Sequence, residues 1–284
     1  ILNWPAITSP LPSSSSGVYN IYQEYPAGVW TLTGTTTNVN FIDTIFVCNG
    51  TINYRVEIAD STGCTSVSSV DGGIFQNTIA PVTPQIDTLS VDDNNHAMMN
   101  WGQSPSGDLQ GYIVFRLSGG SWQPVDTVYG ITNTNYLYPA STAGAGSEQY
   151  ELTGMDSCGN ISPLGTAVKT IYLSAVSDIC TRSAILNWSA YPQIGTGLAG
   201  YRVYQAQAGP AGPYTYVGTT AATVTTYTIT GLTPNISYYF KVQAFDASGT
   251  ESASSNRYTF YSAAPIPPAF SYLRKASVSD PDKV

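Results

Sequence analysis

The phrase Leu186-Asn187-Trp188 decides the fold of this chain, because it has two earlier counterparts, Leu2-Asn3-Trp4 and Met99-Asn100-Trp101. The tryptophans are separated by 97 and then by 87 residues. A period of about ninety residues is much longer than the roughly 20 to 50 residues of a solenoid repeat, and it fits complete small domains that each have a core. The repeat therefore predicts a linear array of domains and says little about chemistry.

Two further phrases follow each tryptophan in the same order. The first occurs at Tyr19–Tyr22, Tyr112–Phe115 and Tyr201–Tyr204, and the second at Tyr54–Asp60, Tyr150–Asp156 and Phe240–Asp246. The second phrase alternates apolar and polar residues and then enters an Asp-x-x-Gly turn, which predicts a half-buried strand before a tight turn. The three aspartates occupy equivalent positions, so we expect them to cap turns and not to form an active site.

The composition indicates an all-β protein. Glycine (26), proline (18) and tyrosine (21) are spread along the chain, and charged residues make up only 10% of it. No segment has apolar residues at helical spacing over three turns, so we expect few helices. Units of about ninety residues are large enough to bury the core of a β-sandwich. The sequence therefore predicts a tandem of β-sandwiches.

The predicted domain boundaries are 1–79, 80–168, 169–263 and 264–284. The first segment begins next to its tryptophan, so we expect a sandwich that lacks its first strand. Proline-rich linkers are expected at the start of the second segment, Ala80–Pro84, and in the last one, whereas the proline-free stretch between Pro163 and Cys180 predicts a tighter joint. Because Tyr272–Asp280 is similar to Thr88–Asp92, the last segment is expected to start a further domain of a longer protein.

Taken together, these phrases resemble fibronectin type III domains. Residues 186–255 show the resemblance best, because Gly231–Pro234 followed by Tyr238 is similar to the tyrosine corner of that family. The corresponding positions in the first two repeats are Ile52 and Glu148, so the corner is missing there. The resemblance implies tandem fibronectin type III or immunoglobulin-like sandwiches, with fibronectin type III-like domains at 80–168 and 169–263.

Large aromatic side chains are expected to hold the cores of these sandwiches together. We expect Trp4, Trp101 and Trp188 to be the core anchors. The tyrosines that are expected to pack against them from the facing sheet are Tyr19, Tyr112 and Tyr201.

The four cysteines, Cys48, Cys64, Cys158 and Cys180, lie at turns that flank predicted strands. An even number of such cysteines is typical of disulfides in an oxidising compartment. Sequence proximity favours Cys48 with Cys64 and Cys158 with Cys180. The strand from about Thr51 to Asp60 would, however, hold the first two about 25 to 30 Å apart. A bridge between adjacent domains, Cys48 with Cys158, and free thiols are the alternatives.

The acidic composition excludes several classes of function. The formal net charge is −8, and ten scattered Lys and Arg residues cannot supply the basic face that nucleic acid requires. The sequence has no run of about eighteen apolar residues, so no segment is predicted to span a membrane. The one histidine, His96, lies in a polar turn after Asp92 and Asp93, and no zinc, nucleophile or phosphate-loop motif occurs. We therefore predict no enzyme activity, no metal and no cofactor, with calcium at the two aspartates as the weaker alternative.

Four short stretches resemble the Asp-Ser/Thr-apolar acceptor pattern for O-glycans on exported bacterial proteins. Their hydroxyl residues are Thr44, Ser61, Thr88 and Thr127. Threonine after aspartate is also ordinary in turns and strands, so the alternative is that these residues only shape the backbone.

A narrower resemblance concerns the exact amino-acid sequence of several segments within the repeats. Cys48–Glu57, Gly63–Ser68, Asp156–Asn160 and Thr170–Leu173 are similar to the fibronectin-like region upstream of the gliding-motility-associated C-terminal domain. That family consists of large surface proteins that the type IX secretion system of gliding Gram-negative bacteria exports. The resemblance implies a secreted cell-surface stalk or adhesive array. Its partners would be the secretion machinery, outer-membrane shuttle or attachment proteins, and surface glycans.

Two other functions remain open. The chain could be an accessory part of a secreted hydrolase, with the catalytic domain outside these residues. It could also bind carbohydrate, which would require exposed aromatic side chains in a row on one face. Trp30 and Trp122 stand at related positions after the third strand, with Tyr214 in the third repeat, although such aromatics are more often core or edge packing.

Overall fold

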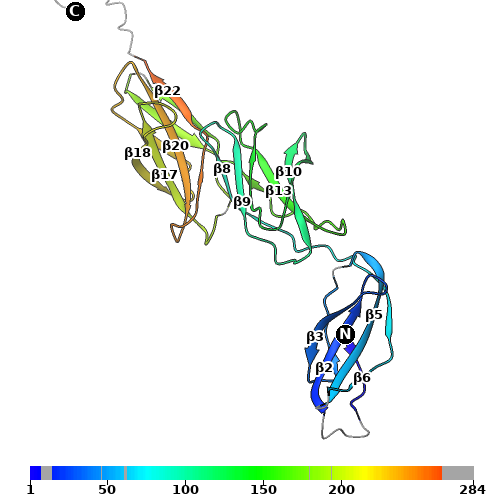
Figure 1. The fold of residues 1–284 in the computed structure, drawn as a ribbon. Helices are drawn as coiled ribbons and strands as arrows, with labels where there is room; N and C mark the ends of the chain where they lie inside the picture. The colour runs from blue at the N-terminus through cyan, green and yellow to red at the C-terminus, as the bar shows by residue number, and fades with distance from the viewer. Residues whose placement is uncertain (8–14, 46, 61–62, 179, 193, 264–284) are drawn as a thin grey trace, which may run out of the picture.

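The computed structural model describes residues 1–7, 15–45, 47–60, 63–178, 180–192 and 194–263. Over these ranges the chain forms strands and turns and no helix, which confirms the all-β prediction. Figure 1 shows three sandwiches that follow one another along the chain, from the blue first sandwich through the green second to the yellow and orange third.

Each sandwich consists of one large and one small antiparallel sheet. The strands of the first sandwich are β1 (Leu2–Asn3), β2 (Ser15–Glu24), β3 (Trp30–Thr36), β4 (Asn40–Phe41), β5 (Asn49–Asp60), β6 (Thr65–Val67) and β7 (Asp71–Gln76). Its large sheet has the order β3-β2-β5, with β6 and β7 both paired to β5. Its small sheet contains only β1 and β4 among the described residues, whereas a complete sandwich of this type would have a third strand in this sheet.

The second and third sandwiches share one topology. The second contains β8 (Ile86–Val91), β9 (Ala97–Trp101), β10 (Leu109–Ser118), β11 (Ser121–Tyr129), β12 (Asn135–Tyr138), β13 (Gln149–Asp156) and β14 (Val168–Lys169). The third contains β15 (Leu173–Asp178), β16 (Ser183–Trp188), β17 (Leu198–Ala206), β18 (Thr215–Ala221), β19 (Thr226–Ile229), β20 (Ile236–Asp246), β21 (Ser252–Ser254) and β22 (Tyr258–Ser262). The small sheets have the orders β12-β9-β8 and β15-β16-β19, and the large sheets β11-β10-β13-β14 and β18-β17-β20-β21, with β22 also on β20.

The strand β14 lies across the predicted boundary between residues 168 and 169. Lys169 pairs in register with Gln149 of β13, so it is part of the second sandwich. Strand pairing therefore continues almost to Leu173, where the third sandwich begins.

Each sandwich has a tryptophan from the small sheet against a tyrosine from the large sheet. The ring centroids are 5.3 Å apart for Trp4 and Tyr19, 5.2 Å for Trp101 and Tyr112, and 5.5 Å for Trp188 and Tyr201, always edge to face. Trp101 and Trp188 are buried, whereas Trp4 is only half-buried. Edge-to-face packing of this kind contributes about 0.5–1.5 kcal/mol beyond the buried area.

The tyrosine corner is present in the third sandwich and replaced in the second. The Tyr238 hydroxyl accepts a hydrogen bond from the Thr233 amide at 2.8 Å. At the equivalent position, the buried Glu148 carboxylate pairs with the Arg116 guanidinium at 2.6 Å and accepts bonds from Thr142 and Tyr150. Burial acts to raise the pKa of Glu148, but the hydrogen bonds outweigh it and hold the pKa below its ordinary value.

The aspartates at the ends of the central strands cap turns, as expected from their repetition. Asp60 accepts a bond from the Cys64 amide, Asp156 from the Asn160 amide and Asp246 from the Glu251 amide. These bonds satisfy backbone N–H groups that the turn would otherwise leave unpaired.

The second and third sandwiches are fused by a continuous core. Tyr191 is buried at this joint, where its hydroxyl accepts a bond from the Leu89 amide of β8 at 2.7 Å. At the edge of the joint, Arg257 donates from Nε to the Asp93 carboxylate at 2.9 Å, and its amide donates to Asn95 Oδ1. The apolar residues of both sandwiches form one buried cluster, so this joint is tightly packed, as the proline-free stretch predicted.

The first and second sandwiches are joined by a disulfide and a few polar contacts. Cys48 is bonded to Cys158, with a sequence separation of 110 residues. Beside the bridge, Asn77 donates from its side chain to Asp108 at 2.9 Å and accepts at its carbonyl from Asn160 at 3.1 Å. Figure 1 shows that only the linker and one end of each sandwich meet here.

This pairing corrects the one that sequence proximity favoured. Cys64 and Cys180 are exposed free thiols, so neither near-neighbour bridge forms. The physical reason is the length of β5, because Cys48 precedes its first residue and Cys64 follows its last. The turn that contains Cys158 instead lies against the end of β5 where Cys48 is placed.

Candidate functional site

The outward face of each large sheet carries the same arrangement of aromatic and charged side chains. The three positions are Tyr22, Trp30 and Arg55 in the first sandwich, Phe115, Trp122 and Glu151 in the second, and Tyr204, Tyr214 and Lys241 in the third. In each sandwich the first and third of these residues are direct partners in strand register. Trp30, Trp122 and Tyr214, which the sequence placed at related positions, thus occupy one structural position.

In the first sandwich the cation of this face already has a carboxylate partner. The Arg55 guanidinium lies 4.5 Å from the ring centroid of Trp30 and 5.2 Å from that of Tyr22. It also pairs with Glu57 at 3.0 Å. The charge that the two rings attract is therefore already balanced by a carboxylate.

In the second sandwich the charged position is occupied by a buried acid. Glu151 is 8% exposed and lies directly opposite Phe115 on the neighbouring strand. Burial raises the pKa of this carboxyl, since the charged form loses its hydration. An acid beside aromatic rings gives this face no cation for an anionic ligand.

In the third sandwich the face is basic and more aromatic. Lys241 Nζ lies 4.6 Å from the ring centroid of Tyr214 and 5.3 Å from that of Tyr204. Tyr216, the register partner of Tyr204, is 58% exposed. Two residues along β17, the Arg202 guanidinium lies 4.1 Å from the ring centroid of Phe245. Burial lowers the pKa of Lys241, and the charge of Arg257 lowers it further.

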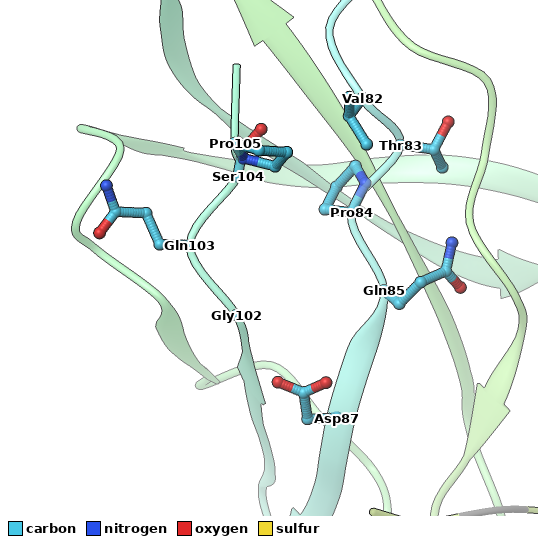
Figure 2. Close-up of a pocket in the computed structure, with 9 residues that line it drawn as sticks. All are labelled: Val82, Thr83, Pro84, Gln85, Asp87, Gly102, Gln103, Ser104 and Pro105. Atoms are coloured by element: carbon cyan, nitrogen blue, oxygen red, sulfur yellow. The ribbon is translucent and has the colours of Figure 1, made fainter. Parts of the chain in front are cut away.

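A shallow cavity of about 210 Å³ lies where the linker from the first sandwich reaches the second (Figure 2). It is formed by Val82–Gln85 on one side and Gly102–Pro105 on the other, with the Asp87 carboxylate near its base. Burial raises the pKa of Asp87, partly offset by a hydrogen bond from the Gly102 amide. Glycoside hydrolysis uses two facing carboxyl groups. This lining supplies one, so the cavity offers no acid–base pair.

The predicted glycan acceptors differ in accessibility. Thr44 is exposed, whereas Thr88 and Thr127 are half-buried within β8 and β11. The Thr88 hydroxyl accepts a bond from the Asn100 side chain at 3.2 Å. Ser61 lies outside the described residues. Of the three described candidates, only Thr44 is an exposed residue.

The turn that contains His96 is stabilised by side chains of the turn itself. Asp92 accepts bonds from the amides of Asn94 and His96, and Asp93 pairs with Arg257 of the third sandwich. In the part of the chain that the structure describes, no three His, Cys, Asp or Glu side chains lie close enough to hold a metal ion. The same part contains no helix with the length and hydropathy of a membrane span.

The sequence indicated the tryptophan and tyrosine positions on the outward faces but missed the charged residues between them. Arg55, Glu151 and Lys241 lie at polar positions of an alternating strand, a pattern that only marks them as solvent-facing. Their common position could have been found by aligning the three repeats on their terminal aspartates, because each precedes that aspartate by five residues.

Comparison with known proteins supports the fold and identifies proteins that are similar to this chain in sequence. The Fibronectin type III domain family matches residues 171–260. Exoglucanase B of Cellulomonas fimi is 30% identical over 250 residues, which are 79% of this chain and 21% of that protein. Chitinase A1 of Niallia circulans is 29% identical over 232 residues, 76% of this chain and 30% of that protein. The chain thus spans less than a third of the length of either enzyme.

Among solved structures, the FN1–FN3 domains of chicken CNTN1 cover 92% of this chain and 93% of their own length. The identity is 15% and the TM-score is 0.30.

Proposed function

Since residues 171–260 form a fibronectin type III domain and the chain is a tandem of fibronectin type III-like sandwiches, we propose that it is a non-catalytic accessory region of a secreted polysaccharide hydrolase. The observation that carries this proposal is the match to glucanase and chitinase sequences over more than three quarters of the chain. The match covers only a part of each relative, which is the pattern expected of an accessory segment.

The geometry supports a spacer within such an enzyme. The second and third sandwiches share a core, and the first is attached to them by a disulfide, so the array has no long free linker among its described joints. A stiff array holds two attached modules at a fixed separation and avoids the chain entropy that a flexible linker would lose on binding. The disulfide supports a location in an oxidising compartment, as a secreted protein would require.

The test of this proposal uses the native polypeptide and the 284-residue chain side by side. An antibody raised against the chain isolates the native protein, whose intact mass and hydrolysis of cellulose and chitin are then measured. We expect a larger polypeptide that releases reducing sugar, while the isolated chain releases none. A native protein that hydrolyses neither polysaccharide would contradict the proposal.

A surface stalk exported by the type IX system is the second candidate, and the exposure of Thr44 after Asp43 favours it. An exported glycoprotein of that kind would carry sugar at this hydroxyl. Peptide mapping of the native protein tests this directly, because sugar mass on the Thr44 peptide would support the stalk. An unmodified peptide would leave the accessory region as the better proposal.

A further inference from the structure

Charge is distributed unevenly along this acidic chain. Residues 1–168 carry thirteen carboxylates and two arginines, whereas residues 169–263 carry three carboxylates and five cations. The five cations are Lys169, Arg182, Arg202, Lys241 and Arg257. Arg202 and Lys241 lie on the outward face of the third sandwich, among its exposed and half-buried rings. The third sandwich is thus a locally basic and aromatic part of a protein that is otherwise strongly acidic.

Neither cation on this face forms an ion pair within the described residues, although the charge of the Asp93 carboxylate acts on Lys241. Arg55, Arg116 and Arg257 each have a carboxylate partner, but none lies within ion-pair distance of Arg202 or Lys241 in the described ranges. Both sit over aromatic rings, which hold a cation in place without cancelling its charge for an approaching anion.

The rings and cations are arranged on three adjacent strands. Tyr204 of β17 pairs in register with Tyr216 of β18 on one side and with Lys241 of β20 on the other. Neighbouring strands lie about 5 Å apart and residues two positions apart on a strand about 7 Å, so Arg202 and Lys241 lie within reach of one extended ligand. The face therefore presents Tyr216 as its exposed ring, set edge-on to Tyr204, with the two cations beside it.

We propose that the outward face of the third sandwich binds a polysaccharide that carries carboxylate groups. The apolar face of a pyranose ring stacks on Tyr216, and its carboxylates pair with Lys241 and Arg202. This inference rests on the proposed function for its choice of a polysaccharide, and it adds the charge class of the polymer.

The experiment measures binding by the 284-residue chain to polygalacturonate, to its fully methyl-esterified form and to a neutral cello-oligosaccharide, by affinity electrophoresis and calorimetry. We expect binding to polygalacturonate that weakens with added salt, and little binding to the other two. Lys241→Gln, Arg202→Gln and Tyr216→Ala are each expected to weaken it about fivefold or more.

Two matched variants control for charge and for lost aromatic surface. Arg182→Gln removes one cation from an exposed turn away from this face, and Tyr129→Ala removes a ring that is 61% exposed in the second sandwich. Both are expected to bind polygalacturonate like the unchanged chain, and circular dichroism checks that every variant is folded.

Three results of the polymer-binding measurements would overturn the inference. They are no binding of polygalacturonate, equal binding of the esterified polymer, and an equal loss in Arg182→Gln, which would show only general charge attraction. Salt-dependent self-association of the chain, abolished by Lys241→Gln without any polymer binding, would also overturn it and assign the face to a second copy. Because hydrolysis is not measured here, failure of this inference and failure of the proposed function are separate results.

Discussion

Removing the bridge between Cys48 and Cys158 is expected to destabilise the second sandwich more than the first. The Asn77 amide donates to the Cys48 carbonyl at 3.1 Å, so residue 77 and the bridge lie at the same place. If the second sandwich unfolds while the first stays folded, residues 78–158 form a closed loop of about 80 residues. The chain-entropy relation then gives a stabilisation of about 4.5 kcal/mol.

The same reasoning gives a smaller effect on the first sandwich. When it unfolds alone, the bridge closes a loop of only about 30 residues, from Cys48 to Asn77, which corresponds to about 3.6 kcal/mol. Measured losses after removal of native disulfides are typically about 2–5 kcal/mol, so both effects should be detectable.

The assay is guanidinium denaturation followed by tryptophan fluorescence, since each sandwich has a tryptophan against its core. The double variant Cys48→Ser/Cys158→Ser is compared with Cys64→Ser/Cys180→Ser, which removes only the exposed thiols. The first should unfold at a lower denaturant concentration and the second should match the unchanged chain. Equal curves for both variants, or four reactive thiols in the unreduced chain, would refute the reasoning.

Three further changes test other parts of the fold. Glu148→Gln is expected to lower the unfolding free energy by about 3 kcal/mol at neutral pH, because it leaves the Arg116 guanidinium without a charged partner. The folded pKa of Glu148 is lowered, so the stabilisation from this carboxylate is present above its ordinary pKa of 4.5 and is lost as pH falls through the folded pKa. The difference in stability between the variant and the unchanged chain should therefore shrink in acid, as measured by denaturation curves. Gly111→Ala places a Cβ 2.6 Å from the Val128 carbonyl oxygen and should cost about 1–3 kcal/mol by thermal unfolding, whereas Gly146→Ala meets nothing within 4 Å and should cost less. Arg257→Met removes a side chain that is only 8% exposed at the joint, and calorimetry should show a loss of about 2 kcal/mol and separate transitions for the second and third sandwiches; a single unshifted transition would contradict that role.

The repeated phrases were sufficient to predict the sandwiches, because each phrase encodes a local structure. The alternation of apolar and polar residues around Tyr201 and Val203 predicts that these two side chains face the core, and both are fully buried. The aspartate turns were predictable for the same reason, since the side chain of Asp246 accepts a hydrogen bond from the amide of Glu251, which is five residues away.

The disulfide could not be predicted in the same way, because it depends on how two domains meet. No pattern in the sequence around Cys158 indicates that its turn lies against the start of β5. The length of the strand from about Thr51 to Asp60 did exclude a direct contact between the cysteines at its two ends, and this length was a better guide to the pairing than sequence proximity. The replacement of the tyrosine corner is similar: the sequence showed that Glu148 stands where a tyrosine was expected, but its partner Arg116 comes from a different strand.

The two joints of the array differ in kind, and this difference determines how the protein responds to its surroundings. The joint at Tyr191 and Arg257 is held by a shared core, which reduction does not change. The joint at Cys48 and Cys158 is held by one covalent bond and by hydrogen bonds of Asn77, which are each worth only about 1 kcal/mol net. Under reducing conditions we therefore expect the first sandwich to move independently while the other two stay fused. If the array separates attached modules, as proposed above, that separation is fixed only where the compartment keeps this bond oxidised.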